Sequence, residues 1–284
     1  MMRYLQIKSY ENWQEIQDAV FSYAHEGLRL MTYLVAITIL LELLSFRTAR
    51  ALYKKNQTLY MQAWMFNFVN HYVLAIPGYI MLRLWLVQDD DKATSEDVVV
   101  TTTVAATAAT SIKILQILWQ VLRITIVHSL GFYQVHKTFH SHPQLYKYHK
   151  FHHSFNTLVP PVSAAAVSPV EYMTAYLFPF LLAVLLFPSI QARAFSVSVL
   201  FMGFFNVVMH CPPLEHYYDA FAPDWIVGTG DHLEHHKRLQ CHYAAPTLDI
   251  DYFVHTVQSS FVSNFLLPGA SPHGGGFVKL EQDS

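Results

Sequence analysis

Long stretches without a charged side chain are the feature of this sequence that most limits its fold. Residues 56–82 contain no Asp, Glu, Lys or Arg, and residues 172–214 contain only Arg193. Because a membrane-spanning helix needs roughly 20 mostly apolar residues, both stretches are long enough to cross a bilayer. Charged residues make up 13% of the chain and hydrophobic ones 53%, and a soluble domain this apolar would expose too much hydrophobic surface. The sequence therefore predicts an all-α integral membrane protein.

The apolar sequence falls into blocks that predict about four to five transmembrane helices. The blocks span residues 30–46, 56–82, 98–133 and 172–214. The first is short for a span, and the third contains Lys113 and Arg123, so we expect Arg123 to face the interior of the helix bundle. The last block is interrupted by Pro188-Ser189 and predicts a helical hairpin. Residues 1–97 are predicted to form an N-terminal membrane-anchoring region.

Basic residues indicate which side of the membrane each loop faces. The loop after the first block contains the basic residues Arg47, Arg50, Lys54 and Lys55. By the positive-inside rule this loop lies in the cytosol. The acidic loop of residues 89–97 then lies across the membrane, and every histidine-rich segment emerges on the cytosolic face. Asn56-Gln57-Thr58 is a glycosylation sequon in the predicted cytosolic loop, so a glycan on Asn56 would contradict this topology.

Net charge and cysteine content narrow the function classes. The formal net charge is −2, so no overall positive field favours nucleic acid, and we expect no nucleic-acid partner. The two cysteines, Cys211 and Cys241, do not make a disulfide framework. They suit a site that faces the reducing cytosol.

Histidine is the residue type that carries the chemistry. The chain has 17 histidines; six fall within residues 136–153, in HKTFHSHPQLYKYHKFHH, and four within residues 232–242, in HLEHHKRLQCH. These segments contain one H-x-x-x-H motif and two H-x-x-H-H motifs, and His210 follows the hairpin in VVMHCPP. Single histidines elsewhere are interpreted as interfacial or hydrogen-bonded residues: His25, His71, His216, His255 and His273.

The spacing of these motifs predicts two metal ions side by side. On a helix, residues three or four apart share one face, with Cβ atoms about 5–6 Å apart, so two imidazoles can bind one ion. The adjacent histidine of H-x-x-H-H points about 100° away and can reach a second ion. Together with His210, the motifs supply nine candidate ligands: His136, His140, His149, His152, His153, His210, His232, His235 and His236.

The ligand type leaves the metal and the reaction open. Imidazole suits Zn, Cu, Fe or Ni, although ordinary zinc sites use only four ligands, or three and a water. A metal pair with open positions suits oxygen activation or two-metal hydrolysis, and the membrane setting favours an apolar substrate, whose unactivated C–H bonds require an oxidant. Three alternatives stand beside an oxygenase. They are a metal transporter, which would need ligands at mid-bilayer depth, a two-zinc membrane hydrolase, and a non-catalytic relative that keeps its metals.

In order and spacing, these motifs resemble the fatty acid hydroxylase superfamily of membrane oxygenases, especially its sterol desaturase branch. The segments that carry the resemblance are GFYQVHKTFH (131–140), YHKFHHSF (148–155), NVVMH (206–210) and GTGDHLEHHKRLQCHYAAPTLDIDYF (228–253). The resemblance covers residues 98–256, which are therefore predicted to form the catalytic domain. Residues 257–284 are predicted to form a flexible C-terminal tail, which is Gly-rich and polar after Pro268.

The resemblance implies a di-iron, oxygen-dependent enzyme of the endoplasmic reticulum membrane. Such an enzyme would hydroxylate or desaturate a sterol or another membrane lipid by hydrogen abstraction, with two Fe ions held in a cytosolic, histidine-rich helical cap. Electrons would come from NAD(P)H, through cytochrome b5 or its reductase. All nine candidate histidines match metal positions of the family. Lys237 and Arg238 are candidates to attract the acidic face of the electron donor.

The chain departs from the family pattern at several positions, which leave the metal positions intact and the substrate open. Lys137 stands where Arg is usual, His128 or Ser129 where an acidic residue is common, His242-Tyr243-Ala244 where Asn-Tyr-Gly is usual, and Ile250 where Trp is frequent. His128, His142 and His242 are candidates for further ligands or for partners of ligands. Four tyrosines flank the motifs and are candidates to orient ligands or substrate: Tyr133, Tyr146, Tyr148 and Tyr243.

Overall fold

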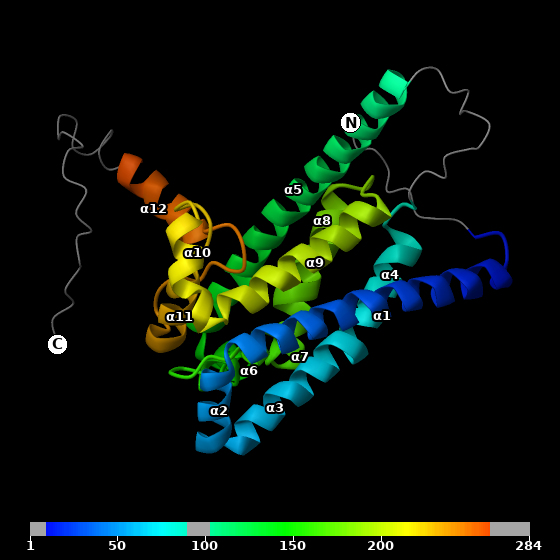
Figure 1. Cartoon of the computed structure of the whole chain (residues 1–284). Coiled ribbons are helices and arrows are strands. Elements are labelled where there is room, and N and C mark those ends of the chain that lie inside the picture. The colour runs from blue at the N-terminus through cyan, green and yellow to red at the C-terminus, as the bar shows by residue number, and fades with distance from the viewer. Residues whose placement is uncertain (1–9, 90–102, 262–284) are drawn as a thin grey trace.

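The computed structural model describes residues 10–89 and 103–261, and every regular element in these ranges is a helix (Figure 1). The first part contains α1 (Trp13–Leu44), α2 (Phe46–Lys55), α3 (Gln57–Phe68), the π-helix η1 (Val69–Ala75) and α4 (Ile76–Trp85). The second contains α5 (Thr103–Ser141), α6 (Pro143–His149), the short helices η2 (His152–Ser154) and η3 (Pro161–Ala165), α7 (Pro169–Glu171), the π-helix η4 (Tyr172–Leu177), α8 (Phe178–Leu186), α9 (Ala192–Met209), η5 (Pro212–Leu214), α10 (Glu215–Phe221), α11 (Thr229–Arg238) and α12 (Ile250–Phe261).

The long helices confirm the predicted integral-membrane fold. Among the described residues, four helices are long and apolar enough to cross a membrane: Trp13–Leu44, Thr110–Ser141, Pro169–Leu186 and Ala192–Met209. The last two form the predicted hairpin, with its turn at Pro188. The α3–η1–α4 run is a fifth unbroken helical stretch, and it carries no acidic residue and only Arg83 near its end. The chain is thus a multi-pass membrane protein.

Two helices are longer than the apolar blocks indicate. The first helix begins at Trp13 rather than near residue 30, because Asn12 caps it by accepting a hydrogen bond from the Glu15 N–H and the early charges lie on exposed positions. The third runs past Tyr133 to Ser141, so it carries the first histidine motif. Arg123 is half-buried rather than interior, with its guanidinium 4.9 Å from the centre of the Phe187 ring.

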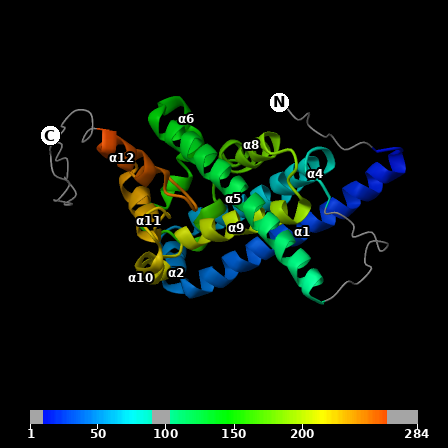
Figure 2. The ribbon, with the colours of Figure 1, turned by 90° about the horizontal axis from the view of Figure 1, so that it is seen from above.

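The membrane helices pack around a shared apolar interior (Figure 2). Helix α1 packs against α4 and α9, and α5 packs against α8 and α9. Gly203 lets α9 approach α1 closely, because a Cβ at that position would lie only 2.6 Å from Leu34 Cδ2. Small residues commonly allow such close helix contacts in membranes. Helix α9, the second helix of the predicted hairpin, therefore lies between α1 and α5.

A buried segment without α-helical structure, residues 159–167 around the short 3-10 helix η3, explains the polar side chains within the apolar spans. Backbone that is not helical is tolerated at membrane depth only where protein groups satisfy it. Four side chains from α1, the α3–η1 run and α9 hydrogen-bond this backbone: Glu42, Asn67, Asn70 and Asn206. Asn70 is fully buried and donates to the carbonyls of Ala165 and Val167, both at 2.9 Å.

We expect Asn70→Leu to lower the free energy of unfolding by about 1–3 kcal/mol. The substitution leaves the Ala165 and Val167 carbonyls without their partner, and each such bond contributes about 1 kcal/mol. Thermal unfolding of the detergent-solubilised protein measures the change. Gln62→Leu is the matched control, because Gln62 is exposed on α3 of the same helical run. Equal stability of the two variants would contradict the anchoring role of Asn70.

The histidine-bearing elements gather at one end of the bundle. Figure 1 shows α6, α7 and α11 at the same end as α2, which carries the basic residues of the first loop, while α4 and the start of α5 lie at the opposite end. This arrangement forms the predicted histidine-rich helical cap. Helix α12 continues past residue 256 to Phe261. The rest of the predicted tail, and the acidic loop beyond Asp89, lie outside the described residues.

Candidate metal centre

All nine predicted histidines lie in two adjacent groups in this cap. The five-histidine group consists of His136, His140, His149, His153 and His235, and the four-histidine group of His152, His210, His232 and His236. Within each group, one ring nitrogen of every residue lies within 4.8 Å of those of the others. Eight of the nine side chains are buried, and His140 is half-buried. The structure thus brings all nine candidate ligands together, five in one group and four in the other.

The two H-x-x-H-H motifs contribute to both groups in a reciprocal way. The first motif gives His149 and His153 to the five-histidine group and His152 to the four-histidine group. The second, on α11, gives His232 and His236 to the four-histidine group and its middle histidine to the other. Residues four apart share a helix face and the residue between them points away. Each motif thus links the two groups.

The rings of the five-histidine group are arranged as a square pyramid. Ring centroids around the base, in the order His136, His149, His153, His235, are separated by 4.7, 4.5, 4.8 and 4.6 Å. The opposite pair, His136 and His153, is 6.4 Å apart with planes only 9° from parallel. His140 lies 4.7–5.0 Å from all four and forms the apex. The position opposite His140 is left without a histidine.

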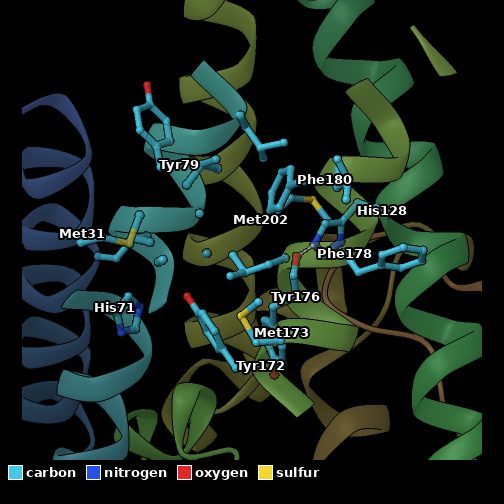
Figure 3. Close-up of a pocket in the computed structure, with 18 of the residues that line it drawn as sticks. Met31, His71, Tyr79, His128, Tyr172, Met173, Tyr176, Phe178, Phe180 and Met202 are labelled. Atoms are coloured by element: carbon cyan, nitrogen blue, oxygen red, sulfur yellow. Dashed lines mark hydrogen bonds between the residues drawn. The ribbon is translucent and has the colours of Figure 1, made fainter. Parts of the chain in front are cut away.

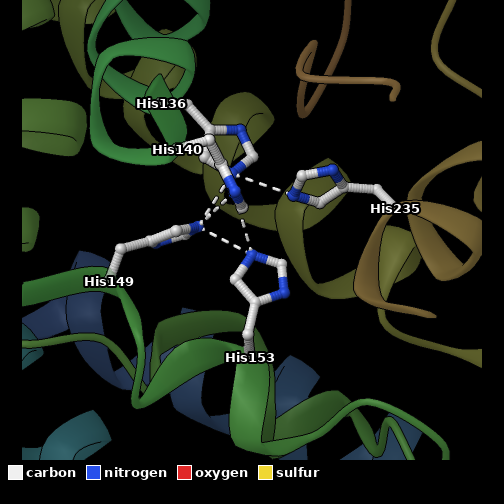
Figure 4. Close-up of side chains that lie close together, drawn as sticks. All are labelled: His136, His140, His149, His153 and His235. Atoms are coloured by element: carbon white, nitrogen blue, oxygen red, sulfur yellow. Dashed lines mark hydrogen bonds between the residues drawn. The ribbon is translucent and has the colours of Figure 1, made fainter. Parts of the chain in front are cut away.

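The nitrogen spacing fits an ion with ligands at right angles. Five contacts between Nε2 atoms of this group measure 2.8–3.1 Å (Figure 4). For metal–nitrogen bonds of about 2.1 Å, neighbouring ligands lie about 3.0 Å apart at 90° and about 3.4 Å apart at the tetrahedral angle. The observed distances match the first geometry. They do not match the tetrahedral geometry of ordinary zinc sites.

The tautomers of two base histidines show that a cation fits between them. His136 Nδ1 lies 2.8 Å from the Tyr243 carbonyl oxygen, and His235 Nδ1 lies 2.6 Å from that of Cys241. A carbonyl only accepts hydrogen bonds, so both Nδ1 atoms carry the proton and both Nε2 atoms present a lone pair. The two Nε2 atoms that carry these lone pairs lie 3.1 Å apart. Without a proton to share, they repel each other unless a cation lies between them.

The four-histidine group is less evenly spaced than the five-histidine group. His152 and His232 lie furthest apart, with ring centroids 6.4 Å apart, while the other ring pairs are separated by 4.4–5.2 Å. The Nε2 atom of His210 lies 3.0, 3.3 and 3.5 Å from those of His232, His236 and His152. These four side chains would hold a second metal ion, so both groups together would hold two.

Glu171 is a partner of the site that the sequence analysis missed. Its Oε1 lies 2.7 Å from His149 Nδ1, and both side chains are buried. Metal-binding histidines are usually oriented by such a carboxylate or by a backbone carbonyl, and His210 uses the carbonyl of Asn206 in this way at 2.7 Å. The available signal was one acidic residue at the start of an apolar span, in SPVE, where Ser168 caps the helix.

Burial keeps the histidines outside the spans neutral, which is the form that binds metal. Burial lowers the pKa of His210 and His235 to about 4. Burial first, and neighbouring imidazoles second, lower the pKa of His152, His232 and His236 well below the usual range. At neutral pH these five imidazoles are therefore neutral, and protons do not compete with a metal ion for their free ring nitrogen.

We expect the metal-free protein to lose stability as the pH falls from about 6.5 to about 4. Unfolded histidine has a pKa of about 6.5, so below that pH the unfolded chain binds more protons than the folded chain. Each pH unit then costs about 1.4 kcal/mol for every imidazole that stays neutral. Thermal unfolding of metal-stripped protein across this range measures the slope, with the exposed His142→Gln as control. A flat profile would contradict the buried, neutral histidines.

The other candidate ligands lie outside both groups. His128 is buried, and its Nε2 lies 3.2 Å from the Tyr176 carbonyl oxygen. His142 Nδ1 lies 3.1 Å from the Thr138 carbonyl oxygen. His242 Nδ1 lies 3.8 Å from the Asp231 carboxylate. His71 is also buried and bonds the Asn67 carbonyl. Tyr243 packs against the site, with its ring 5.3 Å from that of His140.

An apolar cavity of about 510 Å³ lies within the bundle beside the cap (Figure 3). The described residues that line it come mainly from α1, η1, α4, η4, α8 and α9, and no Asp, Glu, Lys or Arg is among them. Asn206 lines the cavity while its carbonyl holds His210. Met81 and Phe178 line it and are about half exposed on the outer surface. The cavity therefore extends from these outer residues to Asn206, whose carbonyl contacts His210.

Comparison with known proteins agrees with the site. The model of the fatty acid hydroxylase family matches residues 121–256, a segment that contains all nine histidines and Glu171. No curated protein and no solved structure matches the chain. Residues 121–256 therefore match the fatty acid hydroxylase family, and with the two histidine groups they have the features of a membrane di-iron oxidoreductase.

Proposed function

We propose that this protein is an oxygen-dependent di-iron enzyme that hydroxylates or desaturates a sterol or another membrane lipid. The observation that carries the proposal is the pair of histidine groups, one with five and one with four rings, beside an uncharged cavity. The reaction for hydroxylation would be RH + O₂ + 2e⁻ + 2H⁺ → ROH + H₂O. Desaturation would instead remove two hydrogens from the lipid and reduce oxygen to two waters.

The ligand set favours iron over zinc. Five imidazoles with right-angle spacing exceed the four-coordinate preference of zinc, and imidazole ligands with open positions suit iron. When bound, the two ions would supply reductive activation of O₂ and abstraction of hydrogen from a C–H bond. The nine histidines would hold those ions. Nδ1 contacts to carbonyl or carboxylate oxygens orient several of the imidazole rings, and the surrounding protein keeps the site buried.

The cavity supports a lipid substrate. Its lining is apolar, and it reaches the lipid-facing surface of the bundle at Met81 and Phe178. An apolar molecule in the bilayer loses no hydration on moving into such a space, whereas a charged headgroup would lose its own. The cavity also reaches Asn206 beside His210, so the deep end of a bound lipid lies near the metal centre.

The supply of electrons and the location are part of the proposal. NAD(P)H, through cytochrome b5 or its reductase, is the proposed donor, and the endoplasmic reticulum membrane is the proposed location. The basic residues of α2 lie at the same end as the cap, which supports a cytosolic site under the positive-inside rule. The exposed Lys237 and Arg238 are proposed to attract the acidic donor.

The test combines metal analysis with comparative lipidomics. Cells with the gene are compared with cells that lack it and with cells that carry a His152→Ala, His235→Ala double variant, which removes one ligand from each group. We expect about two Fe per purified chain and one lipid that differs by one oxygen or by two hydrogens. His255→Ala, at an exposed position on α12, is the matched control. Zinc alone in the purified protein would favour a hydrolase and overturn the proposal, and gene-dependent metal uptake without a changed lipid would favour a transporter.

A further inference from the structure

Two π-helical segments face each other across the cavity. They are η1, residues 69–75, and η4, residues 172–177, and the two are in contact. π-Helical turns are rare and are frequent at functional sites. Each segment places a polar side chain on the cavity wall, His71 from η1 and Tyr172 from η4, with ring centroids 6.3 Å apart (Figure 3). Neither residue belongs to the metal centre.

The tautomer of His71 is fixed by its own helix. His71 Nδ1 lies 2.9 Å from the Asn67 carbonyl oxygen. Since that oxygen can only accept, Nδ1 carries the proton and Nε2 carries a lone pair. Nε2 has no hydrogen-bond partner among the described residues, and protein atoms do not fully enclose it. His71 therefore presents a hydrogen-bond acceptor to the cavity.

Tyr172 presents the complementary donor. Its side chain is only 7% exposed, and its hydroxyl has no hydrogen-bond partner among the described residues. A buried hydroxyl usually has a partner. Protein atoms do not fully enclose this hydroxyl, so it is open to the cavity that Tyr172 lines. One acceptor and one donor, side by side in an apolar space, are thus left for an occupant.

Most of the other polar groups on the cavity wall are engaged elsewhere. The Tyr79 hydroxyl lies 2.8 Å from Ser196 Oγ, the Tyr176 hydroxyl donates to the Ala164 carbonyl, and Asn206 Nδ2 donates to the same carbonyl. His128 keeps an unpaired Nδ1, but that atom is fully enclosed by protein. His71 and Tyr172 are therefore an adjacent acceptor and donor with unused hydrogen-bonding capacity on the cavity wall.

We propose that His71 and Tyr172 bind the hydroxyl group of an uncharged lipid alcohol, which is the substrate class of this enzyme. The alcohol O–H would donate to His71 Nε2, and the Tyr172 O–H would donate to the alcohol oxygen. An ether or ketone can accept from Tyr172 but leaves the His71 lone pair unpaired. A carboxylate would bring negative charge against that lone pair in a space without a cationic residue. This inference rests on the proposed function, because it takes the occupant to be the lipid that is oxidised.

Equilibrium binding without turnover tests the assignment. The probes are radiolabelled cholesterol and octadecan-1-ol, each compared with its own methyl ether, on detergent-solubilised, metal-loaded protein without reductant. The wild-type protein is expected to bind at least one alcohol about fivefold more tightly than its ether, as one hydrogen bond provides. Tyr172→Phe, which removes only the hydroxyl, is expected to weaken binding of that alcohol about fivefold. His71→Leu is expected to abolish the preference for alcohol over ether.

Tyr72→Phe is the matched control, since Tyr72 lies on the same π-helix but does not line the cavity. Equal binding of both alcohols and their ethers by the wild-type protein would overturn the assignment, as would unchanged affinity in Tyr172→Phe. Neither of these two measurements uses His71→Leu, so they test the assignment even if that variant does not fold. Since the assay measures binding alone, an enzyme that binds alcohols but oxidises no lipid would refute the proposed function and leave this site intact.

Discussion

His149→Ala is expected to lower the metal content from two ions to one per chain and to reduce lipid oxidation below detection. His149 is one of the four base histidines of the five-histidine group, and its Nε2 lies 2.8–3.0 Å from those of His136, His140 and His153. Loss of a residue that merely orients a ligand weakens metal binding about 10- to 100-fold, and loss of a ligand costs more. Oxidation needs both ions, so activity falls with the first one lost.

Metal analysis of the purified variant separates this expectation from simple misfolding. The four-histidine group keeps all its members in His149→Ala, so about one ion per chain should remain. His232→Ala is the reciprocal variant: it removes one histidine of the pair that lies furthest apart in the four-histidine group and should spare the ion in the five-histidine group. His142→Ala changes a histidine of the same segment that lies outside both groups and should keep two ions and full activity. Two ions per chain in His149→Ala would show that His149 is not a ligand.

The reciprocal arrangement of the motifs explains how far sequence spacing can locate the two histidine groups. Helical periodicity alone separates His235 from His232 and His236 on α11, because the middle residue points to a different side. Local geometry of this kind depends on neighbouring residues and can be read from sequence. The distribution of the nine histidines over two groups depended on three-dimensional packing, since residues from α5, the segment after it and α11 meet only in the folded chain.

The features that the sequence did not reveal depend on contacts between distant segments. Glu171 is 22 residues from His149, and one acidic residue beside an apolar block resembles an ordinary helix start. Asn67 and Asn70 interrupt an apolar stretch for a reason that only the buried backbone of residues 159–167 supplies. Composition also did not reveal that α1 begins at Trp13, because hydropathy indicates the membrane span and not the full length of a helix.

The polar groups inside the membrane region serve two separate purposes. Asn67, Asn70 and Asn206 satisfy the backbone of the buried segment that closes the cavity at the cap. His71 and Tyr172 instead keep hydrogen-bonding capacity toward the cavity. The first set stabilises the backbone beside the cavity, and we propose that the second set gives the cavity its chemical selectivity. Residues that look alike in a hydropathy profile therefore have different expected phenotypes, namely lower stability and altered ligand preference.

Glu171→Ala is expected to weaken metal binding in the five-histidine group about 10- to 100-fold and to lower activity by a similar factor. The Glu171 carboxylate lies 2.7 Å from His149 Nδ1 and is itself buried at the start of the α7–η4–α8 run. The hydrogen bond that Oε1 accepts holds the proton on Nδ1 and points the Nε2 lone pair toward the metal position, and a carboxylate partner would make the ring a stronger ligand. Removing it frees the ring to rotate and to adopt the other tautomer.

Glu171→Gln separates orientation from charge. The amide oxygen can still accept from His149 Nδ1, so the ring stays in place, while the loss of charge lowers its basicity. We therefore expect metal affinity to fall less in the glutamine variant than in Glu171→Ala, with both retaining the ion of the four-histidine group. Competitive metal titration with a chelator measures the affinities. Glu234→Gln is the matched control, because Glu234 pairs with Lys237 and Arg238 on the outer side of α11. If Glu171→Ala bound metal as tightly as Glu234→Gln, the carboxylate would have no part in holding His149.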